Sequence, residues 1–514
     1  MVAALLALMG GLQIASMREE SQTYDEGLHL AAGVSYWKTG DFRANPEHPP
    51  LGKLLAAVPL LLAGVEWNIG QKQWHEQDQF TLAGPFVYRN KIDADLLLFL
   101  GRLPTVLVSL GLGLGIALTG KRLFGPLAGI VALALYATDP NFIAHGHYIT
   151  NDVLAAAAVF GSAITWLRAV ETDRRRDWAI AAAMLGLALT VKFSTLFLIP
   201  VHAAIAWWNG RLRLRWLAAA FAVVGAMYGP ETLRLNTLPP LADRIPTRTK
   251  MGEAVHAAAL DFRVPGHHYL DGVWQLISHQ ETGHRTYLLG EVKETGTWKY
   301  FFVAFAVKTP TAVLLLLALT AWRVRPALWM NYPAVYFMMS LGSSLNLGLR
   351  HLLPVYPFLF LWIGAGLAWR WWPVLLVALG LQVYEVGRTA PYYTAFFNRP
   401  SGGAENGHKI LLDSNLDWGQ DAKRLGRWVR ERQLEKICVS YFGTASLDYY
   451  GIAQIPIAHA RQGEGLDCWA AVCANDLYDL YLPAGTHAWT RKLTPAGTIG
   501  HSIFLYDLRR GIPR

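Results

Sequence analysis

Hydrophobic residues in this chain are gathered into long stretches, and large polar segments separate some of these stretches. About 20 consecutive apolar residues are enough for a helix to cross a lipid bilayer. The pattern predicts eleven such helices, at roughly 1–17, 99–119, 126–146, 152–170, 178–191, 194–209, 215–230, 300–321, 327–346, 351–369 and 371–387. The apolar run 178–209 divides into two short spans around Lys192, and the stretch 51–64 is expected in the membrane interface as an amphipathic or re-entrant helix.

The composition favours a membrane protein over a series of soluble domains. Of the 514 residues, 53% are hydrophobic and only 16% are charged, against about 25% charged residues in a soluble domain. Ordinary cores cannot hide this much apolar surface, so most of the chain is expected to face lipid. Residues 1–17 lack a basic start and a clear cleavage site, so they are interpreted as a retained first span.

The distribution of basic residues predicts the orientation in the membrane. The net charge is +9, and most short connections rich in Lys and Arg fall on one side. They hold Lys121, Arg122, Arg168, Arg174, Arg175, Arg176, Arg211, Arg213, Arg215, Arg323, Arg325 and Arg370, whereas the short connections on the other side hold Lys192 and Arg350. Basic short loops remain in the cytoplasm, so the amino terminus is expected inside and the carboxyl terminus outside. No nucleic-acid partner is expected.

The polar segments 18–98, 231–299 and 388–514 are then expected outside the membrane. The sequence predicts a transmembrane domain over 1–387 and an α/β domain over 388–514. The elements expected in the second domain are a strand at 409–413, a helix at 421–432 and strands at 436–442 and 501–507.

Three cysteines, Cys438, Cys468 and Cys473, would face an oxidising compartment. Cys468 and Cys473 would point to opposite faces of one strand, so they are not expected to bond to each other. Cys438 can pair with either one.

Ionisable residues accumulate at the outer ends of the predicted helices. They include Asp25, Glu26, Arg102, Asp152, Lys192, Arg350 and His351. Adjacent acids at a membrane boundary are commonly only solvated, and Arg102 could extend to the headgroups, so the signal is their accumulation on one face. Carboxylates can act as general bases, and Lys and Arg bind phosphate. Because the outer face of a bacterial membrane has no supply of nucleotide sugars or ATP, a sugar on a polyprenyl phosphate is the expected donor.

Several motifs resemble the bacterial branch of the protein O-mannosyltransferase-like group, glycosyltransferase family 39, which has the GT-C fold. The motifs are Asp25-Glu26, Glu47-His-Pro-Pro-Leu51, Gly101-Arg-Leu-Pro104, Thr150-Asn-Asp152, Leu187-Ala-Leu-Thr-Val-Lys192, Lys308-Thr-Pro310 and Leu349-Arg-His-Leu-Leu-Pro-Val-Tyr-Pro357. The resemblance covers the whole membrane part. It implies a polytopic α-helical protein of the bacterial cytoplasmic (inner) membrane, with the eleven predicted transmembrane helices and a C-terminal extracytoplasmic α/β domain.

The resemblance also implies roles for individual residues. The catalytic group would consist of Asp25 as the base, Glu26 as a structural acid paired with Arg102, and Asp152 as a second acid near the donor. The expected ligands of the donor phosphate are Arg350, Lys192, Arg102 and His351.

A divalent metal ion is the cofactor that the resemblance suggests. Glu47 would hold it together with a histidine of the outer loop, which offers His256, His267, His268, His279 and His284. The expected ligands are the adjacent His267 and His268, although neighbouring loop histidines are more often only solvated. His48 and His29 stand where the lipid A-modifying branch of the group has cations, so the resemblance does not identify the sugar.

The expected reaction is a single displacement with inversion, in which an acceptor hydroxyl attacks the anomeric carbon and polyprenyl phosphate leaves. The acceptor is a glycan, a lipid or a protein. The alternative is a transporter or flippase for a lipid-linked sugar, but transporters place ionisable groups near the midplane and often on repeated broken helices. The Asp- and Asn-rich stretch 413–421 is interpreted as turns and helix caps, with acceptor binding as the alternative.

Overall fold

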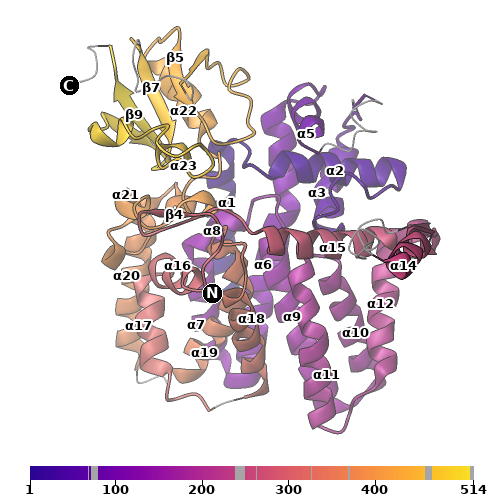
Figure 1. Ribbon diagram of the computed structural model, residues 1–514. Coiled ribbons are helices and arrows are strands. Elements are labelled where there is room, and N and C mark those ends of the chain that lie inside the picture. Colours follow the sequence, from indigo (N-terminus) through magenta and orange to yellow (C-terminus); the bar gives the residue numbers. More distant parts are fainter. Residues whose placement is uncertain are drawn as a thin grey trace.

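The computed structural model describes residues 1–67, 69–70, 79–237, 249–261, 263–325, 327–367, 371–457 and 466–509. It consists of a large helical body and a smaller domain built on a β-sheet, which lies over one end of the helices (Figure 1). This arrangement confirms the predicted fold class, a mostly helical protein with a C-terminal α/β domain.

Helices form in all eleven apolar stretches. Their bounds are α1 (Val2–Glu19), α6 (Ala94–Phe124), α7 (Pro126–Ala137), α9 (Asp152–Thr172), α10 (Arg175–Leu189), α11 (Leu198–Trp208), α12 (Leu214–Tyr228), α16 (Tyr300–Lys308) with α17 (Thr311–Thr320), α18 (Asn331–Leu341), α19 (Tyr356–Gly366) and α20 (Trp372–Thr389). In the described part of the chain, α1, α6 and α9 are each long and apolar enough to cross a membrane. The pair α16 and α17, bent by 105°, would make a fourth span.

Prolines and 3-10 turns shorten several of the other helices. Pro310 separates α16 from α17 because it cannot donate a main-chain hydrogen bond inside a helix. The 3-10 turn η1 (Phe193–Phe197) precedes α11, and the 3-10 turn η4 (Leu349–Val355), which contains Pro354, precedes α19. Turn η1 begins directly after Lys192, and turn η4 contains Arg350. The breaks in the helices therefore fall at charged side chains.

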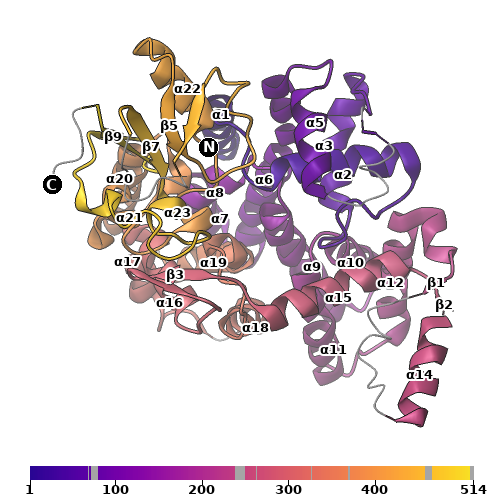
Figure 2. The same cartoon turned by 45° about the horizontal axis from the view of Figure 1, so that its top comes forward.

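The outer segments contribute short helices and two small two-stranded antiparallel sheets. Their elements are α2 (Glu26–Thr39), α3 (Leu51–Leu62), α5 (Gln79–Tyr88), β1 (Asn236–Thr237), α14 (Lys250–Asp261), β2 (Arg263–Val264), α15 (His267–Thr282), β3 (Thr286–Leu288) and β4 (Glu291–Lys293). Figures 1 and 2 show α15 lying across the ends of the long helices. The interfacial helix expected at 51–64 is α3, which packs against α2 and α6.

Helices α11 and α12 join at the end of the body that is away from the sheet domain (Figure 1). Their connection, 209–213, is one of the basic loops that the sequence places in the cytoplasm. The sheet domain therefore lies on the side opposite this basic loop.

The C-terminal sheet has five strands in the order β6-β5-β7-β9-β8. They are β5 (Ile437–Ser440), β6 (Gln454–Pro456), β7 (Trp469–Cys473), β8 (Gly497–Ile499) and β9 (Ile503–Asp507). Strand β5 pairs in parallel with β6 and β7, whereas β9 is antiparallel to β7 and β8. Helix α22 (Ala422–Glu431) packs its apolar side, including Leu425 and Val429, on Val439 of β5.

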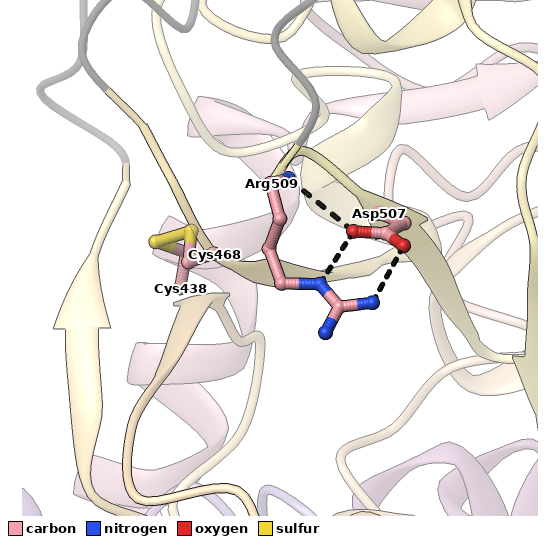
Figure 3. Close-up of a disulfide and its surroundings, with 4 residues drawn as sticks. All are labelled: Cys438, Cys468, Asp507 and Arg509. Carbon is pink, nitrogen blue, oxygen red and sulfur yellow. Dashed lines mark hydrogen bonds and ion pairs between the residues drawn. A yellow bond between two sulfur atoms is a disulfide. The ribbon is translucent and has the colours of Figure 1, made fainter.

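A disulfide joins the two central strands of this sheet. Cys438 in β5 bonds to Cys468, which directly precedes β7, and an ion pair between Asp507 and Arg509 lies nearby at the end of β9 (Figure 3). Cys473 is buried and free. The pairing agrees with the expectation that Cys468 and Cys473 do not bond to each other.

The strand expected at 409–413 is absent from the described structure. Residues 408–410 form a turn after the short helix α21 (Ala404–Gly407), and in this stretch only Leu411 makes a bridge, to Leu288 of β3. The backbone of Asp413 has φ 58°, a left-handed conformation that ends an extended segment. The adjacent apolar residues Leu411 and Leu412 of this stretch are both buried without a strand.

Candidate active site

Four charged side chains from separate helices meet where the C-terminal domain contacts the helical body. Asp25 directly precedes α2, and Asp152 is the first residue of α9. Lys192 precedes η1, and Arg350 lies in η4. Negative side chains are favourable at helix amino termini, so the positions of the two acids agree with the helix dipoles.

Arg350 bridges the two acids. Its Nη1 lies 3.3 Å from Asp25 Oδ2 and 3.4 Å from Asp152 Oδ2. Lys192 Nζ donates to Asp152 Oδ1 at 2.6 Å. Both oxygens of Asp152 are therefore in ion pairs and its side chain is 1% exposed, whereas the side chain of Asp25 is 27% exposed. Asp25 is the more open of the two carboxylates.

The C-terminal domain holds the guanidinium of Arg350 in place. Arg350 Nε donates to Ser414 Oγ at 3.0 Å, and its guanidinium carbon lies 4.1 Å from the centre of the Trp418 ring. A side chain at Gly348 would collide with Ser414 Oγ, so a glycine here permits the close approach. Ser414 and Trp418 belong to the stretch 413–421, which was interpreted from the sequence as turns and helix caps. The Asp-Ser-Asn-Leu-Asp-Trp pattern was the signal that could have pointed to these two residues.

Asp25, Lys192, Arg350 and Trp418 line a cavity of about 1670 Å³ between the helical body, α15 and the sheet domain, whereas Asp152 and Ser414 lie behind its described lining. The helical wall includes Asp25, Glu47, His48, Lys192, Arg350 and His351. The wall from α15 and the loop after it includes Trp274, Gln275, Ser278, His279, Gln280 and His284. The wall from the C-terminal domain includes Asp413, Trp418, Ser440, Phe442, Asp476 and Tyr481. Pockets for drug-sized ligands measure about 300–1,000 Å³, so this cavity is large enough for more than one small group.

Burial controls the charge of several groups on the cavity wall. Burial, and next the positive charge of Lys192, hold the pKa of His48 well below its ordinary value. Burial and His284 lower the pKa of His279, although the nearby Glu47 opposes the shift. These two histidines are therefore neutral near pH 7, so the positive charge beside Asp25 comes from the Lys and Arg side chains.

Glu26 and Arg102 form a buried bidentate pair. Arg102 Nε and Nη2 donate to the two Glu26 oxygens at 2.8 and 2.7 Å. Arg102 also donates to main-chain carbonyls within 17–21, and Glu26 accepts from the N–H groups of Thr23 and Ile149. Burial favours the neutral acid, but Arg102 and these N–H groups keep the pKa of Glu26 below its ordinary value. Neither side chain is among the described residues that line the cavity.

The structure thus separates the expected phosphate ligands into two groups. Lys192, Arg350 and His351 line the cavity, and the His351 ring lies 6.4 Å from the Phe301 ring. Arg102 was expected both with them and in a pair with Glu26, and the structure shows the pair with Glu26. An arginine whose guanidinium donates several hydrogen bonds to the protein has few N–H groups left for a phosphate.

The expected metal ligands are likewise separated. Glu47 lines the cavity, where its charge acts on His279. His267 and His268 lie together at the start of α15, and their neighbouring acid is Glu231 rather than Glu47. Glu231 directly follows the predicted span 215–230, and no motif pointed to it.

A family model described as dolichyl-phosphate-mannose-protein mannosyltransferase matches residues 95–229. Two crystal structures of ArnT from Cupriavidus metallidurans are similar to the chain, each at 14% identity and a TM-score of 0.48. The apo structure aligns over 100% of this chain and 99% of that chain, and the structure bound to undecaprenyl phosphate over 98% and 97%. No curated protein sequence matches significantly. The family match includes Asp152 and Lys192, and it confirms the resemblance that the motifs indicated: over residues 95–229 the chain is similar to the GT-C mannosyltransferases that use dolichyl-phosphate-mannose.

Proposed function

We propose that the protein is an integral-membrane glycosyltransferase that moves a sugar from a polyprenyl-phosphate donor to an acceptor hydroxyl. The observation that supports this most is the cavity in which the open carboxylate of Asp25 lies beside Arg350, with Lys192 on the same wall. A transfer from a lipid phosphate needs a base for the acceptor and cations for the leaving phosphate. The similarity of 95–229 to a mannosyltransferase family supports the same class of reaction.

In the proposed reaction Asp25 accepts the proton of the acceptor hydroxyl as the oxygen attacks the anomeric carbon. The bond from that carbon to the phosphate oxygen breaks, and its electron pair leaves with the polyprenyl phosphate. Attack from the face opposite the phosphate inverts the configuration. Arg350 and Lys192 stabilise the charge that develops on the phosphate, so the site contributes positioning, one base and charge neutralisation.

Asp152 is assigned a positioning role in this scheme. Its two oxygens are paired with Lys192 and Arg350, so neither is free to accept a proton from an acceptor. An acid between two cations also keeps them apart at a fixed separation before a phosphate binds. His351 completes the wall next to Arg350, where it could donate a hydrogen bond to phosphate.

The proposed site faces the outside of a bacterial cytoplasmic membrane. The cavity lies between the helical body and the sheet domain, and the basic connection 209–213 lies at the other end of the helices. By the positive-inside rule this connection is cytoplasmic, which leaves the sheet domain outside. A lipid-linked donor suits that side, and the acceptor is a hydroxyl of a glycan, a lipid or a protein.

The transporter alternative is less well supported by this geometry. A transported sugar needs a path through the middle of the bilayer, with binding groups near the midplane. The ion cluster instead lies at helix ends, and one of its cations, Arg350, is held by side chains of a domain outside the spans, namely Ser414 and Trp418.

The test is complementation of a strain that lacks the protein, with mass spectrometry of its lipids and envelope glycoconjugates. The deletion should accumulate one polyprenyl-phosphate sugar and lose one glycoconjugate, and the wild-type gene should reverse both changes. Asp25→Asn should not restore the product, because loss of a general base costs about 10²–10⁴-fold in rate. Glu66→Gln, at an exposed acid of the same outer segment, is the matched control and should restore it. Full product formation by Asp25→Asn would exclude the proposed role of Asp25.

A further inference from the structure

We infer that Glu231, His267 and His268 bind a zinc ion that joins the start of α15 to the 3-10 turn η2 (Gly229–Leu233), which follows α12. Among the described residues, these three are the group of His, Cys, Asp or Glu side chains whose ligand atoms converge, and the atoms lie within 4.8 Å of one another. The site differs from the set predicted from the sequence, since its acid is Glu231 and it lies away from the cavity. It is independent of the proposed transfer reaction.

The two histidines direct ring nitrogens at one carboxylate oxygen. His268 Nε2 lies 3.3 Å and His267 Nε2 lies 3.8 Å from Glu231 Oε1. The other oxygen, Oε2, is occupied by Arg234 Nη1 at 3.0 Å, which orients the carboxylate toward the histidines. Partners that orient a ligand in this way are typical of metal sites.

The surroundings are those of a built site rather than of a solvated pair. Glu231 and His267 are buried, and the side chain of His268 is 14% exposed. His267 Nε2 also lies 3.0 Å from Asn236 Nδ2, an amide that would move aside for the ion, and the buried Nδ1 of His267 has no hydrogen-bond partner among the described residues. Asp41 Oδ1 lies 3.9 Å from His268 Nε2, close enough to become the fourth ligand, and the second oxygen, after a small movement.

The ligand types favour zinc. Two imidazole nitrogens and one carboxylate form a three-ligand set that binds zinc in a tetrahedral geometry, with a fourth position for water or another acid. Imidazole is a poor ligand for magnesium or calcium, which prefer oxygen.

The position of the site gives the ion a structural role. Gly266 N–H donates to the carbonyl of Thr232 at 2.9 Å, so the main chain already joins the two segments that carry the ligands. One turn beyond the histidines, a side chain at Gly272 would collide with the Pro46 carbonyl and with Phe193, which shows how closely α15 packs on the active-site loops. The later turns of α15 line the cavity. A metal at its first turn would therefore fix the wall of the cavity without touching substrate.

The test is the zinc content of the purified full-length protein in detergent. The protein is stripped with a chelator, reloaded with zinc alone, separated from free metal by gel filtration and measured by plasma mass spectrometry. We expect about one zinc per chain. Glu231→Gln and His268→Asn should each weaken zinc binding by on the order of tenfold or more, since even the loss of an orienting partner has that effect. His256→Asn, in α14 of the same outer segment, is the matched control and should bind like wild type.

A thermal melt separates loss of the metal from loss of the fold. Zinc should raise the melting temperature of the stripped wild-type protein and of His256→Asn, but not that of Glu231→Gln, because a ligand stabilises only the state that binds it. A chain that binds no zinc, or variants that bind it as tightly as wild type, would overturn the inference. Asp25→Asn should retain the zinc, so a failure of the proposed catalytic role can be told apart from a failure of this site.

Discussion

The guanidinium of Arg350 lies 4.1 Å from the centre of the Trp418 ring, so a side chain of the C-terminal domain covers the cation that bridges Asp25 and Asp152. This contact joins the two predicted domains at the candidate site. The C-terminal domain is therefore part of the cavity and not an appendage to the membrane domain.

The first prediction concerns this contact. Trp418→Leu should raise the KM for the lipid-linked donor by about 2- to 30-fold, because a cation–π contact contributes about 0.5–2 kcal/mol. Trp418→Phe keeps an aromatic face and should recover most of the loss. Ser414→Ala, a small truncation, should have an effect in the same direction because it removes the hydrogen bond to Arg350 Nε. The measurement is transfer kinetics with donor extracted from the deletion strain, and a Leu variant with wild-type KM would show that the ring does not position Arg350.

The second prediction separates the two neighbouring acids of the first outer segment. Glu26→Gln should destabilise the protein by about 3–5 kcal/mol, because it leaves the Arg102 charge buried without its partner. Asp25→Asn should leave the melting temperature in detergent near that of wild type, since its carboxylate is partly exposed. If Glu26→Gln melted like wild type and only transfer were lost, Glu26 would be a catalytic rather than a structural acid.

Sequence patterns located the helices and the ionisable residues of the candidate site, but they did not show which distant side chains contact those residues. Apolar stretches and terminal acids are local signals, so the helices and the positions of Asp25, Asp152, Lys192 and Arg350 could be found in the chain. The meeting of Arg350 with Trp418 depends on how a distant domain packs, and no local pattern encodes it. The sheet order β6-β5-β7-β9-β8 was beyond reach for the same reason.

The partners of two sets of polar residues were hard to assign from the sequence, because a charged or metal-binding side chain can be paired in more than one way. Arg102 is a basic residue at the outer end of a span, as a phosphate ligand would be, yet main-chain carbonyls and Glu26 surround it. His267 and His268 were grouped with Glu47 because the family resemblance implied a metal held by an acid at the position of Glu47 and by a histidine of the outer loop. Glu231 was overlooked because it follows an apolar span and looked like a boundary residue.

The third prediction concerns the disulfide between Cys438 and Cys468, which are 30 residues apart. Replacing both by serine should lower the stability of the C-terminal domain by about 3–4 kcal/mol, since the unfolded chain gains the entropy of an open loop. Wild type should lose the same stability on adding a reductant, while the double variant should not respond to it. Cys473→Ala, at the buried free cysteine, is the control that should keep the sensitivity to reductant. Equal melting temperatures with and without reductant in wild type would contradict the prediction.

The last prediction is a pH dependence of stability that arises from Asp476 in α23 (Ala474–Leu477). Burial, with a smaller contribution from Asp479, raises the pKa of Asp476 from 3.8 to about 6, although a hydrogen bond from Ser440 at 2.7 Å opposes the shift. Between pH 3.8 and about pH 6 the folded protein binds more protons than the unfolded chain. Stability therefore falls as the pH rises from about 4 to about 6 and then levels off. The difference between 3.8 and about 6 corresponds to about 3 kcal/mol.

Asp476→Asn mimics the protonated acid and should remove this part of the pH dependence. The variant should match wild type near pH 4 and exceed it above pH 6, as measured by thermal melts in detergent across that range. Asp448→Asn, at an exposed acid that also lines the cavity, should keep the wild-type profile. A parallel pH profile for Asp476→Asn and wild type would mean that Asp476 is ionised in the folded protein throughout, with Ser440 and water replacing the solvation that burial removes.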